Sequence, residues 1–189
     1  ELEVRVKETL EFLDMPKVVF YTSLKERYEG EEKVLNKYGS DFAEFYISAN
    51  RGAEAQPLSK IASGGELARI MLALESVISD KDGIPTIIYD EIDAGVSGKT
   101  ARKIGVKMLE LSSVSQILCI THSAQIASLG DEHLFISKSD INGATETRID
   151  VLDREGRISE LSRILGGIDV TESQRAAAID MLEERKLYK

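Results

Sequence analysis

The order of apolar and polar residues along the chain predicts short helices and strands that alternate through most of its length. At the start, four apolar residues recur at spacings of four, four and three: Leu2, Val6, Leu10 and Leu13. This spacing over residues 1–13 fits the end of a coiled coil and equally a short surface helix. Pro16 is expected to close the helix, because proline lacks the amide proton that a further turn needs.

Two segments rich in β-branched and aromatic residues follow, residues 17–24 and residues 41–50. They flank a charged segment, residues 25–40, and we expect them to form an antiparallel strand pair with a solvated connection. The turn-forming residues within 50–57 predict a loop.

A long amphipathic helix is predicted from Glu66 to about Ile78, with four apolar residues on one face: Leu67, Ile70, Met71 and Leu74. Ser63 and Glu66 form an S-x-x-E capping box at its start. Gly64 and Gly65 leave the first amides of the helix uncovered. These amides carry the positive end of the helix dipole, where a phosphate can bind. Taken alone, the pattern fits a tight turn and a capped helix as well as a phosphate site.

After a polar break at residues 79–83, the pattern alternates between apolar strands and helices. We expect strands at 86–89, 116–121, 133–138 and 146–153, and helices at 97–111, 159–165 and 172–187. This alternation predicts an α/β fold with a mostly parallel sheet flanked by helices, preceded by the short antiparallel strand pair. In such sheets, ligands collect at the carboxyl ends of the strands.

Residues suited to catalysis stand at two of these strand ends. Asp90 and Glu91 directly follow the strand at 86–89, and burying two adjacent carboxylates is costly unless a cation or a hydrogen-bond network receives them. Asp90 is a candidate Mg²⁺ ligand, and Glu91 is a candidate acceptor for the proton of an attacking water. His122 ends the strand at 116–121, where it can reach a γ-phosphate. The alternatives are that the acids cap the next turn and that His122 has a structural role.

The segment from Asp93 to Thr100 resembles the phosphate-binding motif G-x-x-x-x-G-K-[ST], because it ends in Gly98-Lys99-Thr100 between a strand and a helix. The motif has glycine where this chain has Asp93, and an acid there would face the phosphates. A self-contained kinase or GTPase built on this loop is therefore the less favoured alternative. Without it, the chain lacks a triphosphate cradle of its own.

Together, these motifs resemble the carboxyl-terminal half of an ABC-type ATPase head. Within that superfamily, the resemblance is to the RecN family of SMC-like bacterial DNA repair ATPases, and it covers the chain from about Pro57 to the end. Four stretches carry it: ASGGELARIMLALESV, TIIYDEIDAGVSGKTA, ILCITHSAQIASLGDEHLFISK and LSRILGGIDVTE.

The resemblance implies a role for each candidate residue. The ABC signature, which binds the γ-phosphate of ATP held by the opposite subunit, corresponds to Ser63, Gly64, Gly65 and the following Glu66. The Walker B magnesium ligand, the catalytic glutamate, the D-loop acid at the dimer interface and the switch histidine correspond to Asp90, Glu91, Asp93 and His122. The implied cofactors are ATP and Mg²⁺.

The resemblance also implies what the chain lacks and what it works with. Residues 1–15 correspond to the returning end of a coiled coil, and residues 16–189 to the carboxyl-terminal lobe of the head. In this family the Walker A loop and the Q-loop lie in an amino-terminal lobe. We therefore expect that lobe as a partner and expect this chain alone to be inactive as an ATPase. A homodimer of heads around ATP, and contact with DNA ends or single strands, are implied for the full protein.

The implied function is ATP-dependent DNA double-strand-break repair and recombination in the bacterial cytoplasm, at the nucleoid. Two alternatives stay open. One is the head lobe of another SMC-like repair or recombination ATPase, and the other is a catalytically inert lobe that acts only as a packing module.

Composition limits these expectations. The chain has 189 residues and a net charge of -9, which argues against this piece being a nucleic-acid surface by itself. The basic cluster of Arg102, Lys103 and Lys107 is expected to be a solvated helix face.

The single cysteine, Cys119, lies in an apolar run and is expected to be a buried, reduced thiol of a cytosolic protein. We expect no membrane contact, because no apolar run is long enough to span one, and the helical pattern at Glu1 indicates a piece of a longer protein.

Overall fold

The computed structural model describes residues 1–37, 39–48, 52, 54–61, 64–141, 144–167 and 169–188. The helices are α1 (Leu2–Phe12), α2 (Gly64–Asp82), α3 (Gly98–Leu111), α4 (Ala124–Ala127), α5 (Arg154–Gly166) and α6 (Glu172–Glu184), with the short turns η1 (Leu58–Lys60) and η2 (Arg185–Tyr188). The strands are β1 (Val19–Glu26), β2 (Tyr28–Glu29), β3 (Glu32–Lys33), β4 (Asp41–Ser48), β5 (Gln56–Pro57), β6 (Thr86–Asp90), β7 (Gln116–Ile120), β8 (Leu134–Ile141) and β9 (Ala144–Val151).

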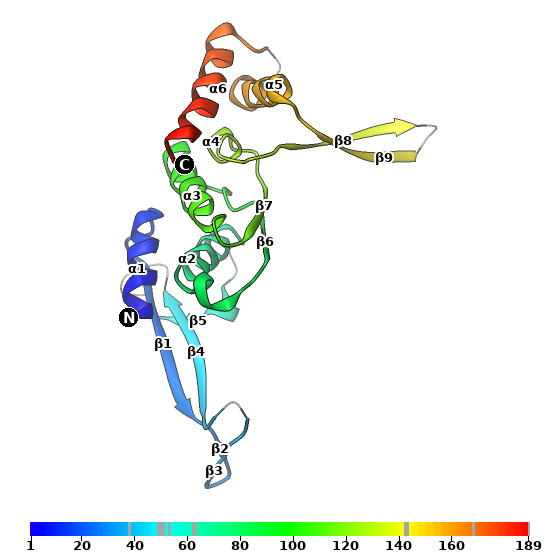
Figure 1. Cartoon of the computed structure of the whole chain (residues 1–189). Coiled ribbons are helices and arrows are strands. Elements are labelled where there is room, and N and C mark those ends of the chain that lie inside the picture. Colours follow the sequence, from blue (N-terminus) through cyan, green and yellow to red (C-terminus); the bar gives the residue numbers. More distant parts are fainter. Residues whose placement is uncertain are drawn as a thin grey trace.

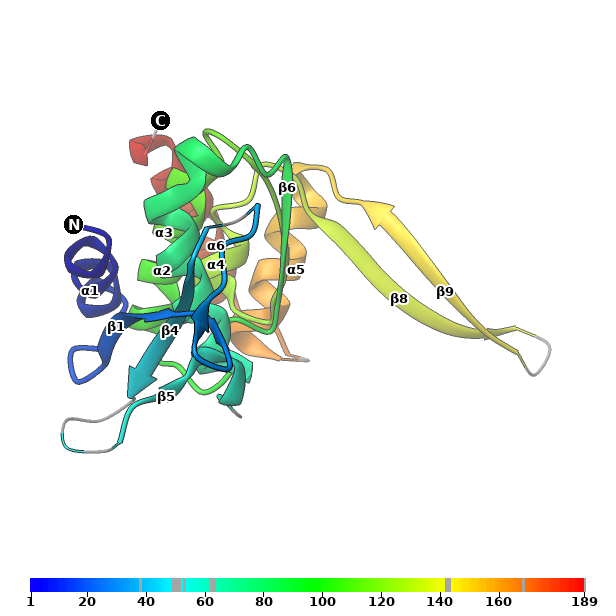
Figure 2. The same cartoon turned by 90° about the horizontal axis from the view of Figure 1, so that it is seen from below.

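The elements form a central body from which two antiparallel ribbons extend (Figure 1). The body contains α2, α3 and the pair β6–β7, with α1 on one side and α5 and α6 at the far end from the ribbon β1–β4. Seen from below, the ribbon β8–β9 reaches well beyond the body (Figure 2). No helix in the described parts of the chain is both long and apolar enough to cross a membrane.

The strand pairing differs in part from the expected sheet. Within the described residues, only β6 and β7 pair in parallel, and the sheets β1–β4–β5, β2–β3 and β8–β9 are antiparallel. The expected pair of residues 17–24 and 41–50 is confirmed as β1 and β4. A mostly parallel sheet is not what this chain forms by itself, because residues 133–138 and 146–153 pair with each other in the hairpin β8–β9. The connection between Ile141 and Ala144 is far too short for a parallel crossover.

Helix α1 ends at Phe12, well before Pro16, because Asp14 adopts a left-handed conformation with a φ of 60°. The amide of Met15 then turns back and donates to the carbonyl of Leu10 at 2.9 Å. Such a bond is typical of a helix that ends in a left-handed residue. The stop signal is therefore Asp14, since aspartate tolerates this conformation better than most residues, and not the proline.

The carboxylate of Asp14 fastens the end of α1 to the first turns of α3. It accepts hydrogen bonds from Thr100 Oγ1 at 2.8 Å and from Lys103 Nζ at 2.6 Å. The bond from Lys103 holds the pKa of Asp14 below its ordinary value. Lys103 and Lys107 also lie over the ring of Phe12, at 5.6 and 5.4 Å from its centre. Each contact is partly exposed and therefore weak, but together they fix how α1 sits on α3.

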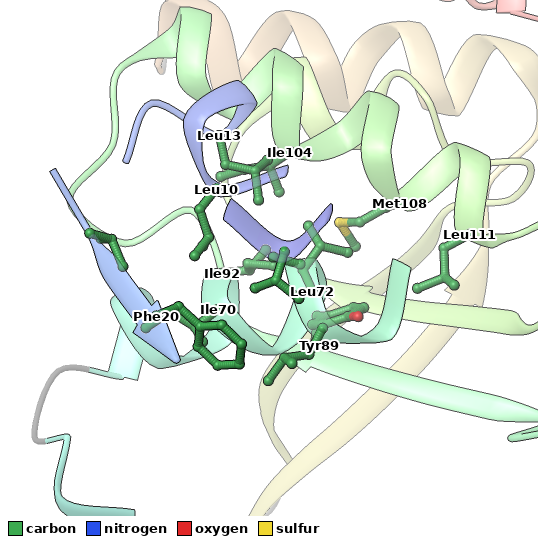
Figure 3. Close-up of a cluster of buried hydrophobic side chains, with 14 of the residues drawn as sticks. Leu10, Leu13, Phe20, Ile70, Leu72, Tyr89, Ile92, Ile104, Met108 and Leu111 are labelled. Carbon is green, nitrogen blue, oxygen red and sulfur yellow. The ribbon is translucent and has the colours of Figure 1, made fainter. Parts of the chain in front are cut away.

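The main core lies where α1, α2, α3 and the β6–β7 pair meet (Figure 3). Its fully buried side chains include Leu10, Leu13, Leu72, Ile92 and Ile104. Helix α2 contributes Ile70, Leu72, Ala73 and Leu74, whereas Met71, which was expected on the buried face, is 36% exposed. The reason is that α1 and α3 both pack on α2 and cover more than one side of it. The helix also runs on to Asp82, through most of the polar break expected at 79–83.

The β6–β7 pair is covered on one face only. The side chains that pack on the core are Ile87, Tyr89, Ile117 and Cys119. On the opposite face, Ile88, Leu118 and Ile120 are 65%, 40% and 51% exposed. Parallel strands are normally covered on both faces. The expectation of a buried parallel strand therefore holds for one face, and the other is an uncovered apolar surface, called here the open sheet face.

A second, smaller core joins α4, α5 and α6, with four buried residues: Ala124, Ile158, Leu161 and Ala178. Two arginines fix these helices to the turn that follows α4. Arg157 donates to the carbonyls of Gly130 and Asp131 at 2.8 and 3.0 Å, and Arg185 Nε donates to that of Leu129 at 2.8 Å. Charged donors of this kind satisfy backbone carbonyls that would otherwise be left without a partner.

Cys119 provides a test of how firmly the core face of β7 is packed. It is a free, partly buried thiol, and burial raises its pKa to about 12. The reactive thiolate is therefore scarce at pH 8. We expect iodoacetamide to alkylate Cys119 in the folded chain on the order of a thousandfold more slowly than in urea, where the thiol pKa is about 8.5. Because a raised pKa delays ionisation, the rate in the folded chain should still be rising at pH 10. Mass spectrometry measures both rates, and equal rates would contradict this packing.

Candidate functional site

The candidate site lies where β6 and β7 end side by side. The register pairs Asp90 with Ile120, and the amide of Glu91 donates to the carbonyl of Ile120 at 3.2 Å. His122 follows β7 after one intervening residue, Thr121. Asp90, Glu91 and His122 therefore stand at one edge of the parallel pair, and all three side chains are exposed. The structure thus brings together the strand-end residues that the sequence singled out.

Glu91 occupies a strained position in the turn after β6. Its φ is 49°, in the left-handed region, where an ordinary side chain costs on the order of 1–2 kcal/mol. The amide of Ala94 closes the turn by donating to the carbonyl of Glu91 at 3.0 Å. Ile92, between them, is fully buried and anchors the turn in the core. Glu91 is thereby held on the solvent side, where a substrate would lie.

Asp93 is buried beneath this turn, with 4% of its surface exposed. Its Oδ2 accepts a hydrogen bond from Thr121 Oγ1 at 2.7 Å, and Thr121 Oγ1 accepts one from the amide of Ser123 at 3.0 Å. Among the described residues, Asp93 Oδ1 has no hydrogen-bond partner. This chain of bonds joins the turn after β6 to the turn after β7, so it couples the positions of Glu91 and His122.

His122 lies beside the same carboxylate. Its Nδ1 is 3.5 Å from Asp93 Oδ2, and its side chain is 79% exposed. The acid can therefore orient the ring from below while most of the ring faces solvent. The family resemblance placed Asp93 at a dimer interface, but its carboxylate is turned inward. An interface role for this loop stays a prediction, and it would rest on exposed neighbours such as Ala94 and Ser97.

The start of α2 packs on the same turn. A side chain at Gly65 would meet the carbonyl oxygen of Ala94 at 3.0 Å, whereas one at Gly64 would meet nothing within 4 Å. Arg69, which is almost fully buried, donates to the carbonyls of Ala94 at 3.3 Å and of Ile92 at 3.5 Å. The first turns of α2 therefore support the turn after β6 from one side, and the glycine at position 65 allows the close approach.

The predicted signature residues lie around this contact. Ser63 is outside the described residues, so the capping box of Ser63 and Glu66 stays a prediction. Gly64 is exposed at the first position of α2, and Gly65 and Glu66 are half-buried. The amino-terminal end of α2 is thus accessible at Gly64, as contact with a phosphate requires.

The loop from Asp93 to Thr100 does not have the features of a phosphate cradle. Asp93 is bonded to Thr121, and Thr100 Oγ1 donates to Asp14. Ser97 is the N-cap residue of α3, and its hydroxyl lies 3.2 Å from that of Thr100. Asp93 and Thr100 are thus engaged in contacts that hold the fold, and Thr100 is the residue whose hydroxyl a P-loop would direct at Mg²⁺. This geometry disfavours the kinase or GTPase alternative.

Asp90 is the candidate metal ligand. The part of the chain that the structure describes contains no group of three histidine, cysteine or acidic side chains that could hold a metal ion. Magnesium, however, is usually bound by one or two carboxylates together with water and phosphate oxygens. The exposed carboxylate of Asp90 at the strand end fits this shared coordination, which needs no cage made by the protein alone.

Sequence reasoning did not assign a role to two residues that shape the site, Arg69 and Thr121. Arg69 stands inside an apolar run, and a buried guanidinium must find acceptors, so its position next to Ile70 could have signalled a structural contact. Thr121 precedes His122 at a strand end. Its bond to Asp93 depends on the register of β6 against β7, which the sequence does not display.

Solved structures show the class to which this fold belongs. The SMC head domain with a coiled coil and joint from Pyrococcus yayanosii aligns with 98% of this chain and 29% of its own, with a TM-score of 0.54 and 21% identity. The SMC head domain with an extended coiled coil from Pyrococcus furiosus, bound to the C-terminal domain of ScpA, aligns with 87% of this chain and 37% of its own, with a TM-score of 0.52 and 21% identity. The fold is the α/β fold of an SMC head domain.

Sequence comparison gives the particular family. DNA repair protein RecN of Halalkalibacterium halodurans is 40% identical over 97% of this chain and 32% of its own length. RecN of Bacillus subtilis is 37% identical over 97% of this chain and 34% of its own. No protein-family model matches the chain. The chain belongs to the RecN family, as its motifs predicted, and it spans about a third of the length of these relatives.

Two adjacent glycines test the contact between α2 and the turn after β6. Gly64→Ala should stabilise the chain by about 0.5–1 kcal/mol, because glycine loses more conformational entropy in a helix than alanine does. The new methyl causes no clash, since it meets nothing within 4 Å. Gly65→Ala should instead lower the free energy of unfolding by about 1 kcal/mol or more, because its methyl would press on the backbone of Ala94. Urea unfolding of both variants measures the difference, and effects of the same sign would contradict this packing.

A second pair of substitutions tests the bond beneath the site. Thr121→Val keeps the shape of the side chain but removes the donor to buried Asp93, and we expect a loss of about 1–3 kcal/mol in the free energy of unfolding. The control is Thr145→Val, which removes an exposed bond from Thr145 Oγ1 to Asp140 of 2.9 Å and should cost no more than about 0.5 kcal/mol. A loss at Thr121 no larger than at Thr145 would show that the buried bond does not hold the two turns together.

Proposed function

We propose that this chain is the carboxyl-terminal lobe of a RecN-type ATPase head that acts in DNA double-strand-break repair and recombination. The observation that supports it best is the meeting of three features at one place. The ends of β6 and β7 present Asp90, Glu91 and His122, and the glycine-rich start of α2 packs on the same turn. Hydrolysis of a nucleoside triphosphate needs a magnesium ligand and a group that positions water, which Asp90 and Glu91 would supply to the ATP of their own head. It also needs donors for the γ-phosphate, which the start of α2 would supply to the ATP of the opposite head.

Each residue then has one role in the proposed reaction. Glu91, held outward by its strained backbone, accepts a hydrogen bond from the attacking water and orients it. His122 reaches toward the γ-phosphate, with Asp93 beneath it as the group that positions its ring. Asp90 would hold Mg²⁺, which neutralises charge on the phosphates when bound. Phosphoryl transfer is catalysed mainly by such positioning and charge stabilisation, so a modest number of well-held groups suffices.

The signature residues act on a second copy of the head. Ser63, Gly64 and Gly65, with Glu66 behind them, would contact the γ-phosphate of ATP that the opposite head holds. ATP would then join two heads across a two-fold axis, and its hydrolysis would release them. The accessible end of α2 at Gly64 is consistent with contact from outside the chain.

An amino-terminal lobe with a Walker A loop would complete each head. The open sheet face supports this proposal. It exposes three apolar side chains of β6 and β7, namely Ile88, Leu118 and Ile120, whereas a parallel pair is normally covered on both faces. The missing lobe would cover this face and bring the triphosphate cradle to the strand ends. The chain alone would then bind and hydrolyse ATP poorly or not at all.

The role in DNA repair is proposed from the relatives, and so are contact with DNA ends or single strands and a place at the nucleoid of a bacterial cytoplasm. Two alternatives differ in measurable ways. Another SMC-like repair ATPase would share the ATP chemistry but differ in its DNA partners. A lobe that acts only as a packing module would show no turnover in any combination.

The decisive experiment measures ATP turnover with Mg²⁺ by this chain alone, by the separately produced amino-terminal lobe and by their mixture. We expect turnover only in the mixture. In that mixture, Glu91→Gln should lower turnover by about a hundredfold or more, since general-base and water-positioning groups contribute about that much, and should leave an ATP-bound dimer that persists in size-exclusion chromatography.

The matched control is Glu146→Gln, which removes an exposed carboxylate from the distant strand β9 and should leave turnover unchanged. Turnover by the chain alone would mean that residues 93–100 do cradle phosphates. A mixture that binds but never hydrolyses ATP would favour the packing module.

A further inference from the structure

The ribbon β1–β4 has an outer face that the core does not use. Cross-strand pairs fix which side chains share a face, and they place Tyr21 opposite Tyr46 and Lys25 opposite Phe42. The alternate residues turn the other way, and Phe20, Phe45 and Ile47 pack toward the core. We call the first set, together with Arg27, the outer face: Tyr21, Lys25, Arg27, Phe42 and Tyr46. The ribbon extends from the body (Figure 1), and Tyr21 and Phe42 on this face are exposed.

Aromatic rings and cations alternate along the outer face. The rings of Tyr21 and Tyr46 stack at 5.4 Å with an interplanar angle of 13°. Lys25 Nζ lies 5.8 Å from the centre of the Tyr46 ring, and the guanidinium of Arg27 lies 5.5 Å from that of Phe42. Tyr21 and Phe42 are 38% and 44% exposed. Large exposed rings gathered on one face are typical of a surface that binds a partner.

The charge on this face differs from the charge of the chain. The chain as a whole carries -9, but the cross-strand pairs of β1 and β4 put one acid, Glu44, on the outer face, opposite Ser23. Glu26 and Asp41 pair on the other face, and Glu26 is engaged by Lys33 at 2.6 Å. The outer face therefore combines two cations with one acid, although the lobe around it is acidic.

The other basic cluster is engaged in internal contacts. On α3, Lys103 bonds Asp14 at 2.6 Å, Lys107 bonds Glu110 at 2.6 Å and Arg102 bonds Glu184 at 2.9 Å. Lys103 and Arg102 hold the helix against its neighbours and Lys107 is paired within the helix, so all three are poorly placed to receive a polyanion. The solvated helix face predicted for this cluster is therefore only part of the picture, because the three side chains are half-buried and each is paired with an acid.

We propose that the outer face of the β1–β4 ribbon binds single-stranded nucleic acid, a proposal that rests on the proposed role of the full protein in DNA repair. Unpaired bases stack on exposed tyrosine and phenylalanine rings, and Lys25 and Arg27 contact the phosphates between them. Positions 42 and 46 are about 13 Å apart along β4, so their rings engage different nucleotides. A duplex hides the faces of its bases and needs more positive charge than this face carries, so single strands are preferred.

The test measures binding of a fluorescent oligothymidylate of about 15 nucleotides to the 189-residue chain by anisotropy at low salt. Tyr21→Val and Phe42→Val keep β-forming side chains but remove the rings, and each should weaken binding about fivefold or more. Lys25→Gln with Arg27→Gln should reduce the slope of log K against log salt by about 1.4, because each phosphate contact contributes about 0.7 for a single strand.

The matched controls leave the outer face intact. Leu24→Val changes a 69% exposed residue on the other face of the same strand, and Lys138→Gln removes an exposed cation from β8. Both should bind like the unaltered chain, and circular dichroism should show every variant folded. The proposal is overturned if the unaltered chain does not bind the oligonucleotide, if a duplex of equal length binds as tightly, or if the ring variants bind as well as the controls.

The outcome is separable from that of the proposed function. The ring variants should keep full ATP turnover in the mixture with the amino-terminal lobe, because the outer face contains none of the residues proposed to act on ATP. Oligonucleotide binding without turnover in the mixture would leave the outer face assigned and the ATPase proposal in error. Self-association of the chain that is lost in Phe42→Val, with no oligonucleotide binding, would assign the face to a protein contact instead.

Discussion

The geometry of the site depends on two adjacent side chains that both turn inward, Ile92 and Asp93. Ile92 is fully buried in the main core, and Asp93 is bonded to Thr121 beneath the turn. Burying an isoleucine is worth about 1.5–3 kcal/mol, which is enough to offset the left-handed backbone of Glu91. The exposure of Glu91 is therefore a consequence of where its neighbours lie. A substitution that lets Ile92 leave the core would disturb the site more than its distance from any substrate suggests.

The same turn is held from three directions. The start of α2 reaches it through Gly65 and Arg69, and the end of β7 reaches it through Thr121. From the far side, α3 begins directly after it at Gly98. Each contact is made by a different segment of the sequence, so the strand ends and the glycine-rich helix start form one rigid unit. Such rigidity is what a site needs when it works by positioning charges and a water molecule.

Sequence reasoning predicted the elements whose signals are local. The parallel pair, the helix after Ser97 and the antiparallel pair β1–β4 all follow from periodicity and strand-forming residues. The motifs also placed Asp90, Glu91 and His122 at strand ends, because that position is a property of the sequence order itself. The Ser63 capping box could be predicted but lies outside the described residues.

The predictions that were wrong concern features set by distant contacts or by a two-residue turn signal. The strands at 133–138 and 146–153 were expected to continue a parallel sheet, although the sequence Asn-Gly at 142 and 143 is a strong hairpin signal. Helix α2 crosses a polar segment because its earlier turns are held by the core, which propensity alone does not reveal. The inward direction of Asp93 depends on its partner on β7, and no pattern in residues 90–100 encodes that partner.

The bond between Asp14 and α3 gives helix α1 a mechanical role. Leu10 and Leu13 hold α1 in the core, and Asp14 ties its end to Thr100 and Lys103. A tilt or twist of α1 therefore acts on the start of α3 through these contacts. Helix α3 begins within a few residues of the turn that holds Glu91. Helix α1 is therefore mechanically coupled to the site. A force on α1 would reach the strand ends as a displacement, with no contact between α1 and a nucleotide.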